Sequence, residues 1–247
     1  MNLNCEGDII LNITSTKAIK LSVTVDGTTT KNIAVGEGIS NIKVATGLSK
    51  NIHTLEVVNE TGLIDGSKVD INSVSFNGTV EAAPENKDLY IEFIGDSISA
   101  GYGLSVTSGD HHDATLAHPY LATKILDADY TILAKSGMGV AYSENEANIF
   151  ENVYPYVNTT RSQDKFTPVR TPNLVVINLH TNDDYQWYSV GGNKEGDYYN
   201  KATFDAKFGF IIKTVTAQYG KNIPMLFVFV CMANDDYTLA TERSIEL

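Results

Sequence analysis

The first part of the chain alternates apolar and polar residues over short runs. These runs occupy residues 8–14, 19–25, 40–46, 53–59 and 71–76. Turn-forming pairs such as Asp26-Gly27 separate them. Alternation with a period of two is typical of strands that bury one face, and short strands at regular spacing indicate a β-sandwich. We therefore predict a β-sandwich domain over residues 1–82.

The pattern changes after a charged, proline-containing stretch that we interpret as a linker, residues 83–88. Beyond it, uninterrupted apolar runs alternate with helical patterns. The apolar runs are residues 89–95, 130–137, 173–180 and 224–231. Strands that are apolar on both faces and separated by helices indicate a parallel sheet covered on both sides. Residues 89–247 are therefore predicted to form an α/β domain.

Two helices are predicted in this second domain. The stronger pattern covers residues 201–219, where apolar residues recur at helical spacing and Gly220 supplies a stop. A shorter helix over residues 118–127 is expected to turn Leu121, Ile125 and Leu126 toward the sheet.

Charge and cysteine content exclude several kinds of partner. The 30 acidic and 18 basic residues give a formal net charge of -12, which repels nucleic acid and anionic lipid but does not penalise a neutral sugar. Cys5 and Cys231 lie far apart, so neither a disulfide framework nor a metal-ligand spacing is present. No apolar run approaches the length of a membrane span, and the first residues lack the basic and long apolar stretches of a signal peptide. We expect no metal, no nucleic acid and no membrane partner.

Candidate chemistry begins where the run 89–95 ends, in Gly95-Asp96-Ser97. Open α/β sheets build their sites at the carboxyl ends of the strands, so Ser97 is at a suitable position for a nucleophile. A serine between a strand and a helix also serves as a helix N-cap. This motif alone leaves both roles open.

The next two predicted strands bring further polar groups to the same edge. One ends in Ser136-Gly137, and the other in His180-Thr181-Asn182-Asp183. A hydroxyl, a flexible backbone amide and a carboxamide are the parts that acyl transfer needs, because the amides stabilise the oxyanion of a tetrahedral intermediate. Gly137 is also compatible with a simple tight turn, and Asn182-Asp183 with a loop cap.

Taken together, these segments resemble a known family. GDSIS followed by AGYG, then SGMG, then INLHTND resemble blocks one to three of the SGNH hydrolases, and closest of all the second carbohydrate esterase family. HTLEVVNETG, before the linker, is similar to a family stretch as well. The resemblance implies an N-terminal jelly-roll β-sandwich followed by a flavodoxin-like hydrolase domain with a parallel sheet.

The resemblance also implies roles for individual residues. Ser97 would attack an acetyl carbonyl, and the Ser97 amide, the Gly137 amide and the Asn182 side chain would form the oxyanion hole. Asp96 is expected to hydrogen-bond within its loop and hold its shape. Family members remove acetyl groups from xylan and glucomannan without a metal or cofactor, and they act outside the cell. An acetylated polysaccharide or oligosaccharide is therefore the expected partner, and the oligomeric state is left open.

Two features depart from the family pattern. Glycine is usual where His180 stands, so a side chain there is expected to crowd the oxyanion loop or reach into the site. The family's general base is a histidine near the C-terminus, and no histidine follows His180 in this sequence. We therefore expect the hydrolase domain to be incomplete at its C-terminal end, and a serine without a base is a weak nucleophile.

His180 is the candidate substitute base, because it shares a strand end with Asn182; a packing role is the alternative. The remaining histidines are expected in other roles, His53 in a strand, His111 and His112 in a loop, and His118 at a helix start.

An aromatic loop follows Asp183. Its residues Tyr185, Trp187 and Tyr188 form a candidate sugar platform, since aromatic faces stack on sugar rings, or plug the loop against the domain. Three functions are therefore open: a carbohydrate O-acetyl esterase, a carbohydrate-binding relative with impaired catalysis, and an SGNH esterase or lipase of other specificity.

Overall fold

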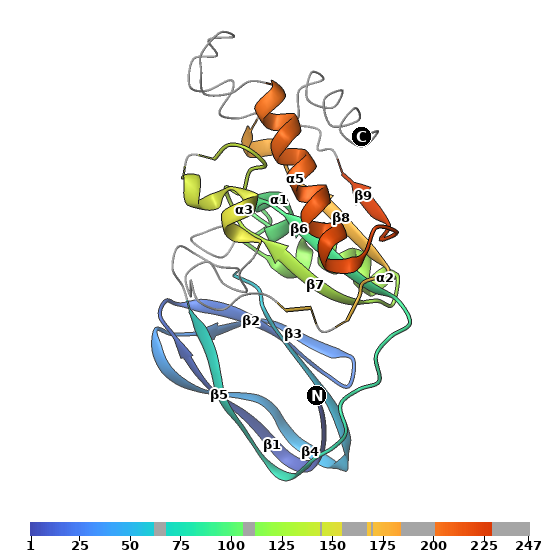
Figure 1. Cartoon of the computed structure of the whole chain (residues 1–247). Helices are drawn as coiled ribbons and strands as arrows, with labels where there is room; N and C mark the ends of the chain where they lie inside the picture. Colours follow the sequence, from blue (N-terminus) through green and yellow to red (C-terminus); the bar gives the residue numbers. More distant parts are fainter. Residues whose placement is uncertain are drawn as a thin grey trace. The chain divides into compact units, whose positions relative to one another are not determined.

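The computed structural model describes residues 1–61, 68–105, 112–143, 145–154, 167–168, 170–183 and 201–228. Contacts between backbone positions group the chain into two compact units (Figure 1). The first comprises Met1–Asn86 and Gly101–Ala117, and the second comprises Lys87–Ala100 and His118–Leu247. The division between Asn86 and Lys87 falls within the predicted linker, whereas the domain bounds 1–82 and 89–247 remain predictions.

Antiparallel strands build the first unit. They are β1 (Asn2–Ser15), β2 (Ile19–Val25), β3 (Thr28–Val35), β4 (Gly38–Asn59) and β5 (Val69–Val80), in the spatial order β3-β2-β4-β1-β5. The long strand β4 pairs with β1 along its first part and with β2 from Leu55 onward. Alternate residues of these strands point inward, so that Leu3, Ile9, Leu11, Ile13, Leu21 and Val23 are buried in one apolar core. The prediction of an N-terminal β-sandwich is confirmed.

Two details of the sandwich differ from the prediction. Residues 40–46 and 53–59 belong to a single continuous strand, because the segment between them also pairs with β1. Strand β3 was not predicted, since most of its side chains are polar and exposed and only Val35 is buried. Backbone pairing with β2 places this strand in the sheet. Such pairing does not require apolar side chains, so the sequence carries no pattern from which the strand could be predicted.

A buried histidine stabilises the turn between β2 and β3. Asp26 and Gly27 both have positive φ, as a tight hairpin turn requires. The Oδ2 atom of Asp26 lies 2.6 Å from Nδ1 of His53, and the carbonyl of Ser49 lies 2.8 Å from Nε2. Both neighbours only accept hydrogen bonds, so the doubly protonated, positively charged form of the ring is the one that can donate to both. The hydrogen bond to Asp26 is the main reason why the pKa of His53 is raised above its ordinary value.

Parallel strands form the sheet of the second unit. They are β6 (Tyr90–Gly95), β7 (Asp129–Ala134), β8 (Leu174–Asn178) and β9 (Met225–Phe227), in the order β7-β6-β8-β9. Among its described residues the helices are α1 (Ser97–Ala100), α2 (His118–Ile125), α3 (Phe150–Val153) and α5 (Lys201–Tyr219), and a short 3-10 turn covers Glu146–Asn148; a second such turn, Ala114–Leu116, belongs to the first unit. The predicted α/β domain is confirmed.

Each face of this sheet has its own apolar layer. Ile94 and Ile177 face α5, which crosses the sheet in Figure 1 and buries Phe204, Phe208 and Ile211. Residues of opposite parity, such as Ile91, Phe93 and Val176, form the layer on the other side. The helix predicted over 201–219 is confirmed at both ends, and Gly220, at a φ of 99°, donates its amide to the carbonyl of Thr216.

The orientation predicted for the shorter helix is wrong. In α2 the buried residues are Pro119 and Thr123. Leu121, Ile125 and Leu126 are instead 43%, 84% and 53% exposed. Eight residues give only two turns, so the apolar pattern in the sequence did not determine which side of the helix packs.

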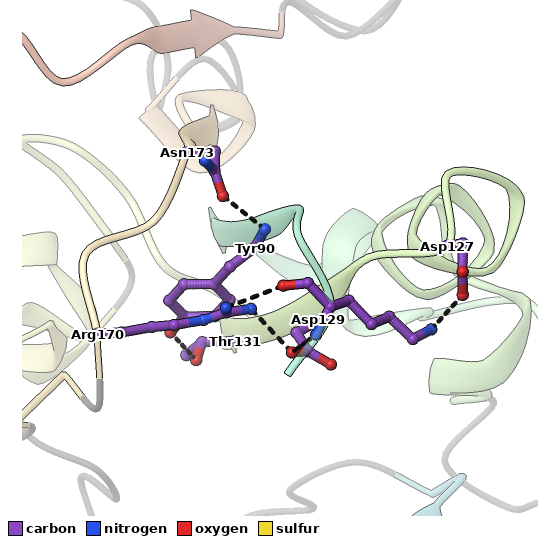
Figure 2. Close-up of polar contacts among 7 residues, drawn as sticks. Tyr90, Asp127, Asp129, Thr131, Arg170 and Asn173 are labelled. Carbon is purple, nitrogen blue, oxygen red and sulfur yellow. Dashed lines mark hydrogen bonds and ion pairs between the residues drawn. The ribbon is translucent and has the colours of Figure 1, made fainter. Parts of the chain in front are cut away.

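An arginine clamps the amino-terminal edge of the sheet (Figure 2). Arg170 stacks on the ring of Tyr90, with its guanidinium carbon 4.7 Å from the ring centroid. Its two terminal nitrogens donate to the carbonyl of Lys87 at 2.9 Å and to Asp129 at 2.8 Å. The amide of Lys87 also donates to Asp129. The clamp therefore ties the entry to β6, the start of β7 and the approach to β8.

We expect the His53–Asp26 pair to make stability depend on pH. A base whose pKa is higher in the folded than in the unfolded state adds to the stability of the folded state. This contribution is complete at pH values below the pKa of the unfolded state, and it is lost as the pH rises through the pKa of the folded state. Urea unfolding between about pH 6 and 9 should show the free energy of unfolding falling with pH. His53→Gln and Asp26→Asn should each flatten this dependence; an unchanged slope would contradict the pair's role.

Replacing the clamp should destabilise the second unit. Arg170→Ala removes the ionic hydrogen bond to Asp129, the hydrogen bond to the Lys87 carbonyl and the cation–π contact with the Tyr90 ring. The free energy of unfolding should therefore fall by about 2–3 kcal/mol. Arg170→Lys keeps the charge but not the planar fork, and its loss should be intermediate. Lys213→Ala, on the exposed side of α5, is the control and should change stability by less than about 0.5 kcal/mol.

Candidate active site

The pairing of β6 with both neighbours brings three strand ends into register. Gly95, the last residue of β6, pairs with Ala134 of β7 on one side and with Asn178 of β8 on the other. The amide of Lys135 also donates to the carbonyl of Gly95, at 3.0 Å. The segments that carry Ser97, Gly137 and Asn182 therefore leave the sheet at the same edge, within two to four residues of paired positions.

Asp96, rather than Ser97, caps the helix that follows β6. Helix α1 begins at Ser97, and Oδ1 of Asp96 accepts a hydrogen bond from the amide of Ile98 at 2.9 Å. Asp96 is fully buried, and burial raises its pKa to about 6 despite that bond. The expectation that Asp96 holds the loop is confirmed. Since the cap is supplied by Asp96, the N-cap explanation for Ser97 is not needed.

Gly137 lies in a tight turn after β7. Its φ is +82°, a conformation that L side chains rarely adopt. The amide of Met138 donates to the carbonyl of Lys135, and the hydroxyl of Ser143 donates to the carbonyl of Gly137 at 2.7 Å. The turn is therefore fixed by bonds on both sides, and Gly137 satisfies a conformational need whatever its chemical role.

Asn182 reaches the Gly137 turn directly. Its Nδ2 atom donates to the carbonyl of Met138 at 2.9 Å. A carboxamide has two N–H groups, so this bond leaves the second one for another acceptor. Asn182 is thus bonded to the residue that follows Gly137, although the bonded residues are 44 positions apart in the sequence.

His180 occupies a backbone position that favours glycine. Its φ is 99°, in the region that residues with a side chain rarely adopt, which agrees with the glycine expected there. Its side chain is only 1% exposed and packs edge-on against Phe204 of α5, with ring centroids 6.3 Å apart. This location corresponds to the packing alternative; the role of substitute base remains a prediction.

A second serine in α1 contacts a histidine. The Oγ atom of Ser99 lies 3.1 Å from Nε2 of His118, and Ser99 is 2% exposed. His118 is the first residue of α2, as predicted, and burial lowers its pKa. Because Ser99 is inaccessible, we interpret this pair as a tie between α1 and α2.

Sequence reasoning missed a second fully buried acid of the site. Asp183 is 0% exposed and accepts hydrogen bonds from three successive amides of the segment after Gly139. Burial raises its pKa to about 7, and the three amides oppose that shift. The signal in the sequence was only its position after Asn182. Tyr185, Trp187 and Tyr188 lie outside the described residues, so the sugar platform stays a prediction.

Comparison with known proteins gives matches over both units. The sequence profile of the family described as GDSL-like Lipase/Acylhydrolase matches residues 91–237. The cellulase/esterase CelE of Acetivibrio thermocellus is 25% identical over 219 residues, which are 84% of this chain and 25% of that protein. An acetylxylan esterase / glucomannan deacetylase of Cellvibrio japonicus is 35% identical over 113 residues, which are 41% of this chain and 31% of that protein. The chain thus spans about a quarter to a third of the length of these relatives.

Solved structures share the fold. A family two carbohydrate esterase from Clostridium thermocellum, in complex with cellohexaose, has a TM-score of 0.81 at 22% identity and covers 100% of this chain and 76% of its own. An acetyl xylan esterase from Butyrivibrio proteoclasticus has a TM-score of 0.82 at 15% identity, with coverage of 100% and 76%. At these identities the likeness concerns the fold. Among the described residues, no helix is long and apolar enough to cross a membrane.

Gly95 should not tolerate a side chain. A Cβ atom there would lie 2.0 Å from Oγ and 2.4 Å from Cβ of Ser99, so α1 would have to move. Gly95→Ala should therefore lower the free energy of unfolding by about 2–3 kcal/mol. Gly209→Ala is the matched control, since nothing lies within 4 Å of its Cβ in α5, and it should stabilise by about 0.5–1 kcal/mol. Equal effects in urea unfolding would show that the contact with Ser99 does not matter.

Proposed function

Because the chain belongs to the GDSL-like lipase/acylhydrolase family, we propose that it is a serine ester hydrolase that removes acetyl groups from plant-wall polysaccharide. The expected substrates are of the acetylxylan or glucomannan type. We expect the reaction to proceed through an acetyl-enzyme at Ser97 and to need no metal or cofactor.

One observation carries this proposal. Three strand ends in register present Ser97, Gly137 and Asn182 at one edge of the sheet, and the last two segments are bonded through Asn182 and Met138. A nucleophile beside a backbone amide and a carboxamide is suited to stabilise an oxyanion at a carbonyl carbon under attack.

The steps follow from these groups. The Ser97 hydroxyl would lose its proton to a base as its oxygen attacks the acetyl carbon. The resulting oxyanion would accept hydrogen bonds from the amides of Ser97 and Gly137 and from the second N–H of Asn182. Collapse would break the bond between the acetyl carbon and the sugar oxygen; that oxygen takes the proton from the base and leaves as a hydroxyl, while the acetyl group stays on Ser97. Water would then attack the same carbon, release acetate and restore the serine.

The base is the part of the mechanism to be tested most directly. His180 is the candidate base in this sequence, because it lies on the strand end that carries Asn182. Its burial against Phe204 favours packing over proton transfer. His180→Gly would remove the imidazole and also relieve the positive φ. If His180 is the base, this variant loses turnover; if it is a packing residue, turnover per folded molecule is retained.

The substrate class is supported by the relatives. The two similar proteins named above are described as a cellulase/esterase and as an acetylxylan esterase / glucomannan deacetylase. A neutral acetylated sugar also suits a chain with a formal net charge of -12 better than an anionic substrate does. Since polysaccharide of this kind does not enter cells intact, we propose that the protein acts outside the cell.

A second function is carbohydrate binding without turnover. A similar structure is of an esterase whose active site is described as displaying divergent catalytic and non-catalytic binding functions. In this chain, the buried position of His180 favours such a role, since a serine without a base reacts poorly. Binding of cellohexaose by a chain that does not hydrolyse acetyl esters would identify this function.

Ser97→Ala should abolish ester hydrolysis. We expect a loss of at least about 10³-fold in kcat/KM for p-nitrophenyl acetate, because the acetyl-enzyme can no longer form. Mass spectrometry of the unsubstituted chain should detect acetylation of Ser97. Acetylated xylan and glucomannan should be better substrates than p-nitrophenyl octanoate; the reverse preference would favour a lipase, whose long acyl chain needs an apolar groove.

The control for this experiment is Ser75→Ala. Ser75 is exposed on β5 of the first unit, so its loss should leave the rate unchanged. Equal activity of Ser97→Ala and the unsubstituted chain would rule out a serine mechanism at this site.

A further inference from the structure

A single buried carboxylate organises the segment that contains Gly137. We call residues 136–143 the Gly137 loop. Oδ2 of Asp183 accepts from the amide of Val140 at 2.8 Å. Oδ1 accepts from the amides of Ala141 and Tyr142 at 2.7 and 2.8 Å. Three successive backbone donors therefore converge on one side chain, which comes from the segment that follows β8.

The loop has to pass close to itself and to Asp183 for these bonds to form. A Cβ atom at Gly139 would lie 1.7 Å from the carbonyl oxygen of Tyr142 and 3.1 Å from Oδ2 of Asp183. The amide of Gly139 also donates to the carbonyl of Asn148, and its carbonyl accepts from the amide of Phe150, the first residue of α3. The backbone therefore surrounds the carboxylate, and its path leaves no room for a side chain at position 139.

The same loop is also bonded at the residues next to the proposed oxyanion donor. Ser143 donates to the carbonyl of Gly137, and Asn182 donates to the carbonyl of Met138. Asp183 follows Asn182 directly, so it anchors the far end of the loop while its neighbour bonds to the near end. We therefore expect that loss of the Asp183 bonds would loosen the far end of the loop and leave the Gly137 turn with only its own bonds and the one from Asn182.

We propose that Asp183 is a positioning residue that holds the Gly137 amide and the Asn182 side chain in the geometry of an oxyanion hole. This inference rests on the proposed function and deepens it. Oxyanion donors contribute to rate only when they are fixed where the charge develops, and removal of one donor costs about 10²–10³ in kcat. A substitution that displaces the donors without removing them should lower kcat by a smaller factor and leave KM nearly unchanged.

Asp183→Asn tests this role with little change in volume. The asparagine Oδ1 can still accept from Ala141 and Tyr142, but its NH₂ group faces the amide of Val140 and cannot accept from it. We expect kcat for p-nitrophenyl acetate to fall about 10- to 100-fold, with KM within about threefold. The Val140 amide should exchange with deuterium at least about tenfold faster in NMR measurements, because it has lost its acceptor.

A double-mutant cycle separates positioning from general destabilisation. If Asp183 acts through Asn182, then the effects of Asp183→Asn and Asn182→Ala on kcat should be strongly non-additive. Additive losses would overturn the proposal. Ser143→Ala is a milder variant for the case that Asp183→Asn does not fold, since it removes a bond to the Gly137 carbonyl without leaving a charge buried. It should lower kcat about 3- to 10-fold, and an unchanged kcat would overturn the idea that loop geometry limits turnover.

Glu92→Gln is the matched control. Glu92 is a fully buried carboxylate of the same unit, on β6, and its oxygens accept from the hydroxyls of Tyr154 and Tyr219. Its neutral variant should lower stability but leave kcat per folded molecule within about twofold. An equal loss of kcat in Glu92→Gln and Asp183→Asn would show that any buried carboxylate has this effect, and would overturn a specific role.

Failure of the proposed function gives a different result. In that case the unsubstituted chain shows no turnover that depends on Ser97, before any change at Asp183. The exchange measurement still tests the structural step: unchanged protection of Val140 in Asp183→Asn overturns the inference whatever the activity. Lost protection with unchanged kcat in an active enzyme overturns it as well.

Discussion

The parallel pairing of β6 with both β7 and β8 is the constraint on which the candidate site depends. Because Gly95 pairs with Ala134 on one side and Asn178 on the other, the three segments beyond them start from neighbouring points. A shift of one residue in either pairing would send alternate side chains to the opposite faces of the sheet. The apolar layers on the two faces, around Ile94 and around Phe93, hold this register.

Polar groups gather where these strands end, although the site lies above an apolar core. Asp96, Asn178 and Asp183 are each at most 2% exposed. Burial of such groups is costly unless they are hydrogen-bonded. Asp96 accepts a bond from an amide at the start of α1, and Asp183 accepts bonds from amides of the Gly137 loop. The acids therefore shape the loops more than they offer charge to a substrate. Fixed loops of this kind are what an oxyanion site requires.

Much of the fold was predictable because strong periodic patterns persist over long segments. The sheet strands of the second unit are continuous apolar runs, and α5 has apolar residues at helical spacing. Patterns of this length are compatible with few other secondary structures. The predictions failed where the pattern was short or polar. In α2, two turns did not determine which side packs, and in β3, backbone pairing decides the strand without help from apolar side chains.

The sequence by itself determined the order of the units and the strand ends at which Ser97, Gly137 and Asn182 stand, since these follow from local pattern and chain order. Only the tertiary structure decided that the His180 ring packs on Phe204 and that Asp183 binds the Gly137 loop. The physical reason is the range of the contacts. The Asp183 bonds join residues 41 to 43 positions apart, and no local pattern encodes which distant amides a buried carboxylate will accept.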